Sequence, residues 1–417
     1  MRDAYIAGTG MTKFGKFMDS NIRTLAEEAV TEALKDASAQ ASDIDMIFFA
    51  NATAGILSGQ EMIRGQVALR NLGLLGKPII NVENACASGS SAVYLARMAV
   101  ASGASDVCLA VGSEKLTHED KAKSFAAFGA AVDMIMLGDV IKLLKEQEEA
   151  KKLERANSPE GSKGKGSGDG GKSMFMDIYA AWAQGYMSKS GATKEDFAQV
   201  AVKSHKNASL NPKAQYRDVV TVEEVLNSRL VADPLTLLMC APIGDGAAAV
   251  LVCSKEFIEK KGLQPIKIRA SILLSGRDRA LNEPGVAQVA SKLAYEEAGL
   301  GPSDINVVEL HDAAAPAELI TCEELGLCAE GDGPKLLKSG DTSLGGRVPI
   351  NTSGGLISKG HPIGATGCSQ IVELADQLRG RAGARQVENA KIALAENGGG
   401  FLGTDAAAMA INILSRD

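Results

Sequence analysis

The sequence predicts an α/β protein in which buried strands alternate with amphipathic helices. Three observations favour this fold class. Strands that are apolar on both faces alternate with helical segments, so we expect mainly parallel sheets buried between helices. Only 4% of the 417 residues are aromatic and 45 are Gly, which predicts an aliphatic core with close backbone approaches, as layered α/β packing requires. The third observation is an internal repeat.

Two parts of the chain share one order of elements. In the longest match, an amphipathic helix, a Ser-Asp-Ile sequence and a β-branched strand follow one another twice. The matched pairs are 26–50 with 290–313, 244–252 with 403–411, and Ala4–Gly8 with Ile266–Leu274. Any two α/β segments look somewhat alike, but three pairs in the same order favour a duplication. We therefore expect two similar halves, 1–260 and 261–417.

The first half is longer because it carries an insertion at about 115–195. Within it, Lys142–Arg155 is predicted to be a charged helix with Glu and Lys at helical spacing. Ser158–Ser173 contains six Gly in sixteen residues and is predicted to be a flexible loop. Met174–Ser188 resumes a helical apolar pattern. Insertions of this size on a rigid scaffold commonly carry ligand contacts or a partner surface.

Charge and cysteine content exclude several classes of protein. The chain has 44 Lys and Arg against 51 Asp and Glu, a net charge of −7, so we expect neither a nucleic-acid partner nor a membrane. Its seven cysteines form no Cys-x-x-Cys pair, which argues against a disulfide framework, a zinc ribbon or any other metal site. No signal sequence or long apolar segment is found, so the predicted location is cytoplasmic.

Several short patterns are not supported by their context. Gly166–Ser173 matches a phosphate-binding loop but follows no buried strand. Gly8–Gly10 follows a strand, but the next glycine comes too late for a dinucleotide fingerprint. His118–Asp120 is predicted to be a solvated loop, and His205 is expected to be exposed on a polar helix.

The first candidate catalytic residue is Cys86. It follows a buried strand that ends near Val82 and precedes an Ala-rich helix, next to the small residues Ala87, Ser88 and Gly89. The positive end of the helix dipole should lower the cysteine pKa below its usual value of ~8.5 and favour the thiolate. Free backbone N–H groups at a helix start can also bind an oxyanion. The alternative is a small buried cysteine that fills a gap.

Two histidines and a glycine run are the other candidates. His361 lies in a Gly-rich segment, 351–368, before a predicted helix, and could take the thiol proton or donate to an enolate. His311 and Asp312 follow a strand at the end where α/β sheets build sites, or they form a structural hydrogen bond. Residues 393–403 end a strand in three consecutive glycines, which either offer N–H groups to an anion or form a tight hairpin.

Together these segments resemble the thiolase family over nearly the whole chain. The sequence NACASGSSA around Cys86 is similar to the family's nucleophile motif, and GGLISKGHPIGATG around His361 is very close to its Gly-His-Pro signature. The histidine in HDAA resembles the branch related to sterol carrier protein X. The resemblance implies a duplicated five-layer α-β-α-β-α core with an inserted loop domain, and usually a dimer.

The resemblance also implies a role for each matching residue. Cys86 matches the acylated nucleophile, and His361 matches the histidine that activates it and helps to hold the thioester oxygen. His311 matches the residue that fixes a water molecule in this first oxyanion hole. The backbone N–H groups of Cys86 and Gly398 would form the second hole.

The sequence departs from the family at the proton-shuttling cysteine. Most thiolases have a second cysteine two residues before the glycine run, where this chain has Glu396. In the sterol carrier branch the spare cysteine follows the His-Asp pair, where this chain has Ala313. We predict that Glu396 takes part of the missing role, because burial would raise its pKa toward the working pH. The alternative is a structural hydrogen-bonding role.

The predicted function is therefore CoA-dependent cleavage of a 3-oxoacyl-CoA, or the reverse condensation. CoA is then a co-substrate, and no permanently bound cofactor is expected. The alternatives are a condensing acyltransferase that needs one cysteine, and a non-catalytic subunit that binds acyl-CoA. The lost cysteine and the altered loop are similar to thiolases that act on bulky or aromatic substrates, such as benzoylsuccinyl-CoA.

We also expect partners from the same resemblance. A homodimer is predicted, with a small accessory subunit that combines an OB-fold and a zinc ribbon. Related thiolases often pair with such a protein, which can supply part of the CoA tunnel. The net charge of −7 disfavours unaided capture of a polyanion, and a self-sufficient homodimer is the alternative.

Overall fold

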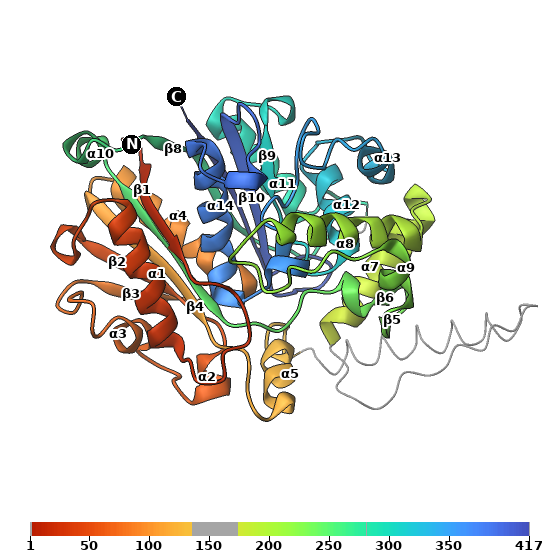
Figure 1. The fold of residues 1–417 in the computed structure, drawn as a ribbon, viewed down its shortest axis with the longest axis horizontal. Helices are drawn as coiled ribbons and strands as arrows, with labels where there is room; N and C mark the ends of the chain where they lie inside the picture. Colours follow the sequence, from red (N-terminus) through yellow and green to blue (C-terminus); the bar gives the residue numbers. More distant parts are fainter. Residues whose placement is uncertain (1, 136–173, 281, 417) are drawn as a thin grey trace, which may run out of the picture.

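Nine strands form one mixed sheet in the computed structural model, which describes residues 2–135, 174–280 and 282–416 (Figure 1). The strand order is β3-β2-β4-β7-β1-β8-β11-β10-β9. The strands are β1 (Tyr5–Met11), β2 (Met46–Ala50), β3 (Ile79–Val82), β4 (Val107–Glu114), β7 (Gly246–Cys253), β8 (Ile266–Ser275), β9 (Val307–Glu309), β10 (Ile392–Gly399) and β11 (Ala408–Ser415). A separate hairpin pairs β5 (Leu230–Ala232) with β6 (Leu235–Thr236).

The prediction of mainly parallel sheets is wrong. In the described part of the sheet, β2 pairs in parallel with β3 and β4, and β9 with β10. The five other neighbouring pairs are antiparallel. The apolar pattern predicted burial on both faces correctly, since β4 and β7 are buried throughout. Burial alone does not determine strand direction, because helices cover both faces in either arrangement.

The helices and the two halves of the sheet stack in five layers. The N-terminal half-sheet is β3-β2-β4-β7-β1, and the C-terminal half-sheet is β8-β11-β10-β9. One apolar cluster joins α1 (Ile22–Asp36) to the outer face of the N-terminal half-sheet. A second cluster joins α4 (Ser88–Ala101) and α14 (Thr366–Arg379) to strands of both half-sheets. A third joins α11 (Val286–Ala298) to the outer face of the C-terminal half-sheet. This arrangement confirms the predicted α-β-α-β-α order.

The repeated segments fold alike. In each, a helix leads through a short 3₁₀ turn, Ala41–Asp43 or Pro302–Asp304, into a strand of the sheet. The two half-sheets meet where Tyr5 and Ile6 of β1 pair with the first residues of β8. The division of the chain near residue 260 into two domains stays a prediction.

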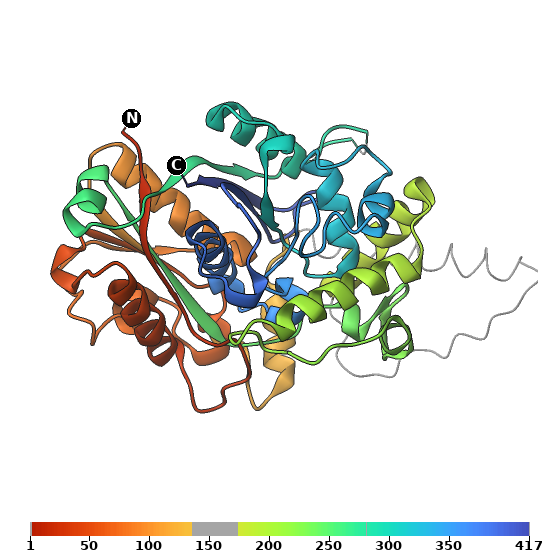
Figure 2. The same ribbon diagram turned by 45° about the horizontal axis from the view of Figure 1, so that its top comes forward.

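A helical segment outside the sheet connects β4 to β7. It includes α5 (Lys121–Gly129) and α7 (Met174–Ser190), so the helical pattern predicted from Met174 is confirmed. Helices α8 and α9 continue it beside the C-terminal half (Figure 2). The predicted helix Lys142–Arg155 and the predicted loop Ser158–Ser173 lie outside the described residues. The remaining helices are α2 (Ala54–Ser58), α3 (Arg64–Ala68), α8 (Lys194–Ser209), α9 (Val222–Asn227), α10 (Lys255–Lys261), α12 (Ala315–Glu324) and α13 (Gly333–Lys338).

All seven cysteines are free thiols. Among the described helices, none is both long and apolar enough to cross a membrane.

Candidate active site

Cys86 lies in a strand–turn–helix connection, as the sequence predicted. Strand β3 ends at Val82, a 3₁₀ turn spans Ala85–Ala87, and α4 begins at Ser88. The turn is tight enough to place Ala85 at φ 47°, in the left-handed region that costs energy for a residue with a Cβ. The Ser88 hydroxyl holds the turn, because it donates to Ala85 O at 2.6 Å and accepts from Asn84 N at 2.9 Å.

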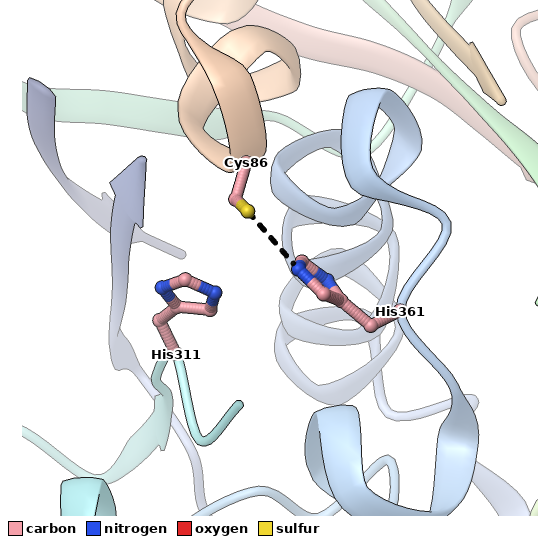
Figure 3. A group of neighbouring side chains, drawn as sticks. All are labelled: Cys86, His311 and His361. Carbon is pink, nitrogen blue, oxygen red and sulfur yellow. Dashed lines mark hydrogen bonds between the residues drawn. The ribbon is translucent and has the colours of Figure 1, made fainter. Parts of the chain in front are cut away.

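His361 is in hydrogen-bond contact with Cys86 (Figure 3). The distance from His361 Nε2 to Cys86 Sγ is 3.2 Å. On the other side of the ring, Nδ1 lies 2.7 Å from Thr366 Oγ1, which donates its own proton to Pro362 O at 3.1 Å. The hydroxyl has one proton, so it accepts from Nδ1–H, and Nε2 presents a lone pair to the thiol. The pair can therefore pass a proton from sulfur to nitrogen.

Replacing Thr366 with Val should misorient this base. The hydroxyl fixes the tautomer, and a lost hydrogen bond costs about 1 kcal/mol, so we expect turnover to fall about fivefold with little change in KM. Steady-state kinetics of Thr366→Val beside Thr366→Ser test this. Equal activity of wild type and Thr366→Val would show that the hydroxyl does not position His361.

The prediction that Cys86 has a lowered pKa is wrong. The pKa of the thiol is raised to about 12, mainly by burial and to a smaller extent by the charges of Glu114 and Glu83. The backbone N–H groups of Gly400 and of Cys86 itself lower it, but their effect is smaller than the loss of hydration. The helix dipole does not lower the pKa below its usual value, because Cys86 precedes the helix and lines a largely apolar cavity. Cys86 thus rests as a thiol and needs a base.

The base is neutral at rest. Burial, and then the neighbouring His311 and Lys359, hold the pKa of His361 well below its usual value. An uncharged imidazole facing a protonated thiol is a resting pair that ionises only when proton transfer is coupled to attack on substrate.

His311 lies beside this pair (Figure 3). It follows β9, and its ring centre is 5.1 Å from that of His361. Its Nε2 is buried and has no partner among the described residues, while burial lowers its pKa to about 4. Among the described residues no hydrogen bond joins the side chains of His311 and Asp312, because Asp312 Oδ1 accepts from Leu356 N at 2.6 Å and Asp312 Oδ2 has no partner. The free ring nitrogen is available to water or substrate.

Glu396 lies directly behind His311. It belongs to β10, is 2% exposed, and its Oε2 accepts the backbone N–H of His311 at 2.8 Å. Burial raises the pKa of Glu396 to about 7, against the smaller lowering effect of that hydrogen bond. The raised pKa expected from the sequence is therefore found, and this carboxyl can gain or lose a proton near neutral pH.

The glycine run contributes at two places. A Cβ on Gly398 would lie 3.3 Å from His311 Nδ1, so this glycine makes room for the histidine. Gly400 has φ 63°, and its N–H points at the Cys86 sulfur. Sequence analysis missed Gly400 because three consecutive glycines look equivalent. The oxyanion role of the Gly398 N–H stays a prediction.

A buried glutamate that no sequence motif indicated joins the loop that carries His361 to the half of the sheet that carries Cys86. Glu114, at the end of β4, accepts hydrogen bonds from Gly364 N at 3.0 Å and from Thr53 Oγ1 at 2.6 Å. The backbone of β4 and the His361 loop approach so closely that a Cβ on Gly112 would lie 2.1 Å from Gly364 O. The loop that carries His361 is thereby fixed against the half of the sheet that carries Cys86.

Cys86, His311 and His361 line one cavity of about 820 Å³, together with residues of α5 and α7. His205 also lines it and is 4% exposed, with Nδ1 2.9 Å from Asp218 O. The prediction of an exposed His205 is therefore wrong, because the loop that contains Asp218 covers the helix face that looked polar in sequence.

The same three residues are also a possible metal-binding set. One donor atom each from Cys86, His311 and His361 lies within 4.8 Å of the others. One cysteine and two histidines can bind zinc, but a bound ion would block the sulfur and the lone pair of His361. Cys86 therefore cannot act as a nucleophile while it binds a metal ion. The absence of a metal stays a prediction.

Comparison with known proteins identifies the family. The N-terminal domain of thiolases matches residues 4–256, and the thiolase C-terminal domain-like family matches 276–413. The chain belongs to the thiolase family. It is similar to acetyl-CoA acetyltransferase of Methanothermobacter thermautotrophicus, with 37% identity and all of both chains covered. It is equally similar to the benzoylsuccinyl-CoA thiolase subunit BbsB of Thauera aromatica, with 93% of this chain and 92% of BbsB covered.

Two further relatives support this assignment. Human sterol carrier protein 2 is 37% identical over 95% of this thiolase chain and 70% of its own length. A solved structure entitled Ltp2-ChsH2(DUF35) aldolase has a TM-score of 0.76 and 28% identity, covering all of this chain and 98% of the other. This chain is thus an acyltransferase of the thiolase type, and the predicted resemblance to the sterol carrier branch is confirmed.

Proposed function

We propose that this thiolase cleaves a 3-oxoacyl-CoA with CoA through an acyl group on Cys86. The observation that supports this most directly is the 3.2 Å contact between the Cys86 sulfur and the unprotonated ring nitrogen of His361. A thiol beside an oriented base is the arrangement that acyl transfer by a nucleophile requires.

The first half-reaction transfers the acyl group. The Cys86 sulfur bonds to the 3-oxo carbon while its proton passes to Nε2 of His361. The C2–C3 bond then breaks, and its electron pair forms the enolate of the fragment that carries CoA. Glu396 donates a proton to C2 of this enolate, through water where the distance requires it. His311, through its free Nε2, holds a water molecule against the enolate oxygen, and the N–H groups of Cys86 and Gly398 bind the acyl oxygen.

The second half-reaction restores the enzyme. The thiol of CoA gives its proton to the Glu396 carboxylate and attacks the acyl-cysteine. The Cys86 sulfur leaves and takes back its proton from His361, so the sum consumes only 3-oxoacyl-CoA and CoA. Read in reverse, the same groups carry out condensation.

Incubation of the protein, purified together with any accessory subunit, with a 3-oxoacyl-CoA and CoA tests this function. Formation of two shorter thioesters supports thiolysis. Transfer of the acyl group to an acceptor other than CoA would favour a single-cysteine condensing acyltransferase. Binding without turnover would favour an acyl-CoA-binding subunit.

Cationic side chains at the cavity suit CoA as co-substrate. Lys16, Lys121 and Arg229 line the cavity, and among the described residues none of them forms an ion pair with a carboxylate. Unpaired cations attract the phosphates of CoA. The three residues lie far apart in the chain, so no motif in the sequence indicated a cationic cluster.

For the substrate, we propose a bulky or aromatic acyl group, with benzoylsuccinyl-CoA as a specific candidate. The support is the 37% identity to BbsB, whose name gives that substrate, and the largely apolar wall of the cavity. We place the enzyme in the cytoplasm, which suits its seven free thiols.

An accessory subunit is expected in the active complex. BbsB is named as a subunit, and the Ltp2 structure includes a DUF35 protein. The chain expressed alone should then bind CoA weakly and show little thiolysis, and addition of a small OB-fold/zinc-ribbon protein should restore both. Calorimetric titration with CoA measures the difference. Full activity and micromolar CoA affinity of the chain alone would contradict the prediction.

We propose that the homodimer interface is formed by the sheet edge at strand β3. This strand pairs only with β2, and Ile80 on it is 43% exposed. Nearby, Met62 and Ile63 are 75% and 60% exposed. An unprotected apolar sheet edge favours pairing with a second chain. Ile80→Lys should convert the dimer to a monomer in light scattering, whereas Met18→Lys, at an exposed position elsewhere, should not.

A further inference from the structure

Aromatic side chains are concentrated in the active-site cavity. The whole chain has 10 Phe, 6 Tyr and 1 Trp, and five of these line the one cavity that contains Cys86. Phe125 and Phe128 are three residues apart on α5, and Phe175 and Tyr179 are four apart on α7. At these spacings each helix presents two rings on one face. Tyr216 is the fifth.

The rings of α5 lie near the reacting sulfur. Phe128 packs in the same small apolar cluster as Cys86. The chain just after α5 contacts the glycine run, because Phe401 N donates to Ala131 O at 2.9 Å. A Cβ on Gly400, whose N–H faces the sulfur, would lie 3.1 Å from that same carbonyl. The end of α5 is therefore adjacent to the place where the acyl group must sit.

The ring of Tyr179 reaches the same place from α7. It packs edge-on against Trp182 with ring centres 5.4 Å apart, and Trp182 packs against Phe401 with ring centres 5.8 Å apart. Burial raises the pKa of Tyr179, and the charges of Cys86 and then Glu396 raise it further. The hydroxyl thus lies within the field of both groups and stays protonated, as a hydrogen-bond donor.

We propose that α5 and α7 form an aromatic acyl subsite, which selects substrates with an aromatic ring next to the 3-oxo carbon. Phe125, Phe128, Phe175 and Tyr179 contact the ring, and the Tyr179 hydroxyl donates to an oxygen of the acyl group. This inference rests on the proposed thiolysis and adds the residues that set its specificity. Packing between two aromatic rings contributes about 0.5–1.5 kcal/mol beyond burial, so two or three such contacts discriminate strongly against a methyl group.

The test compares 3-oxo-3-phenylpropionyl-CoA with acetoacetyl-CoA, using the full chain with any subunit that co-purifies. We expect kcat/KM to favour the phenyl substrate by at least about tenfold. Phe128→Leu and Tyr179→Leu should each reduce this preference about tenfold. In Phe128→Leu the loss should fall mainly on the phenyl substrate, whereas Tyr179→Leu also removes the hydroxyl and should lower kcat for both substrates. Tyr179→Phe should keep the ring preference and lower kcat. Tyr186→Phe is the matched control, because Tyr186 lies on the same helix but donates to Glu323.

Binding provides a second measurement that does not need turnover. Trp182 is the only tryptophan in the chain, so its fluorescence reports on the Tyr179 side of the cavity. In Cys86→Ala, the phenyl substrate should change this fluorescence and CoA alone should not. An equal change with CoA alone would show that the rings bind its adenine and would overturn the proposal. An unchanged substrate preference in both Leu variants would also overturn it, whereas no acylation by either substrate would contradict the proposed thiolysis itself.

Discussion

Cys86→Ala should abolish both acyl-enzyme formation and turnover. Cys86 alone combines contact with a histidine base, a backbone N–H from the glycine run and access to the cavity. Intact-protein mass spectrometry after exposure to acyl-CoA should show one adduct on the wild-type chain and none on the variant. Because the mechanism needs a covalent bond to this sulfur, we expect the loss of turnover to exceed about 10⁴-fold.

Two other cysteines make this test specific. Cys240 also lines the cavity, but its sulfur donates to Thr236 O and burial raises its pKa to about 12 with no base in contact. Cys328 is half-buried away from the cavity, so Cys328→Ala is the matched control and should keep full activity. An adduct on Cys240, or turnover by Cys86→Ala, would refute the mechanism.

Glu396→Gln should reduce thiolysis by about 10²-fold or more, the usual contribution of a general acid. The amide can still accept the N–H of His311, so the fold around the histidine is retained while the transferable proton is lost. Acyl-enzyme formation should slow, because the enolate is no longer protonated. Near wild-type rates would assign the proton to His311 or to a bound water molecule instead.

The pH profile separates this role from a structural one. The pKa of Glu396 is raised to about 7, and a proton donor acts in its protonated form. Thiolysis should therefore decline as the pH rises above about 7, and Glu396→Gln should remove this decline. His361 adds no transition there, because its pKa lies well below the usual value.

Glu324→Gln is the control for these measurements. Its carboxyl also has a raised pKa, about 8, owing to burial and to the charge of Glu396. It does not line the cavity or contact His311, so its loss should leave the alkaline decline in place. Disappearance of the decline in this variant would assign the titration to Glu324.

Sequence motifs were enough to find the reacting residues, but not the residues that orient them and set their pKa values. Cys86 and His361 could be found because a glycine-rich turn before a helix is a local pattern. Gly400 and Glu114 could not, because each acts through a contact made only when distant segments fold together. Thr366 lies five residues from His361, but its hydrogen bond to the ring depends on how the turn between them folds. The wrong pKa prediction for Cys86 has the same origin, since a helix dipole is visible in sequence and the loss of hydration in a closed cavity is not.

The central layer has an evolutionary consequence. Cys86 lies in a 3₁₀ turn that leads into α4, and His361 lies two residues before a 3₁₀ turn, Ile363–Ala365, that leads into α14. These two helices pack side by side between the half-sheets. If both helices descend from one ancestral element, the two copies now have different roles, because one positions the nucleophile and the other the base. Substitutions that shift either helix are then constrained, because they would change the distance between Cys86 and His361.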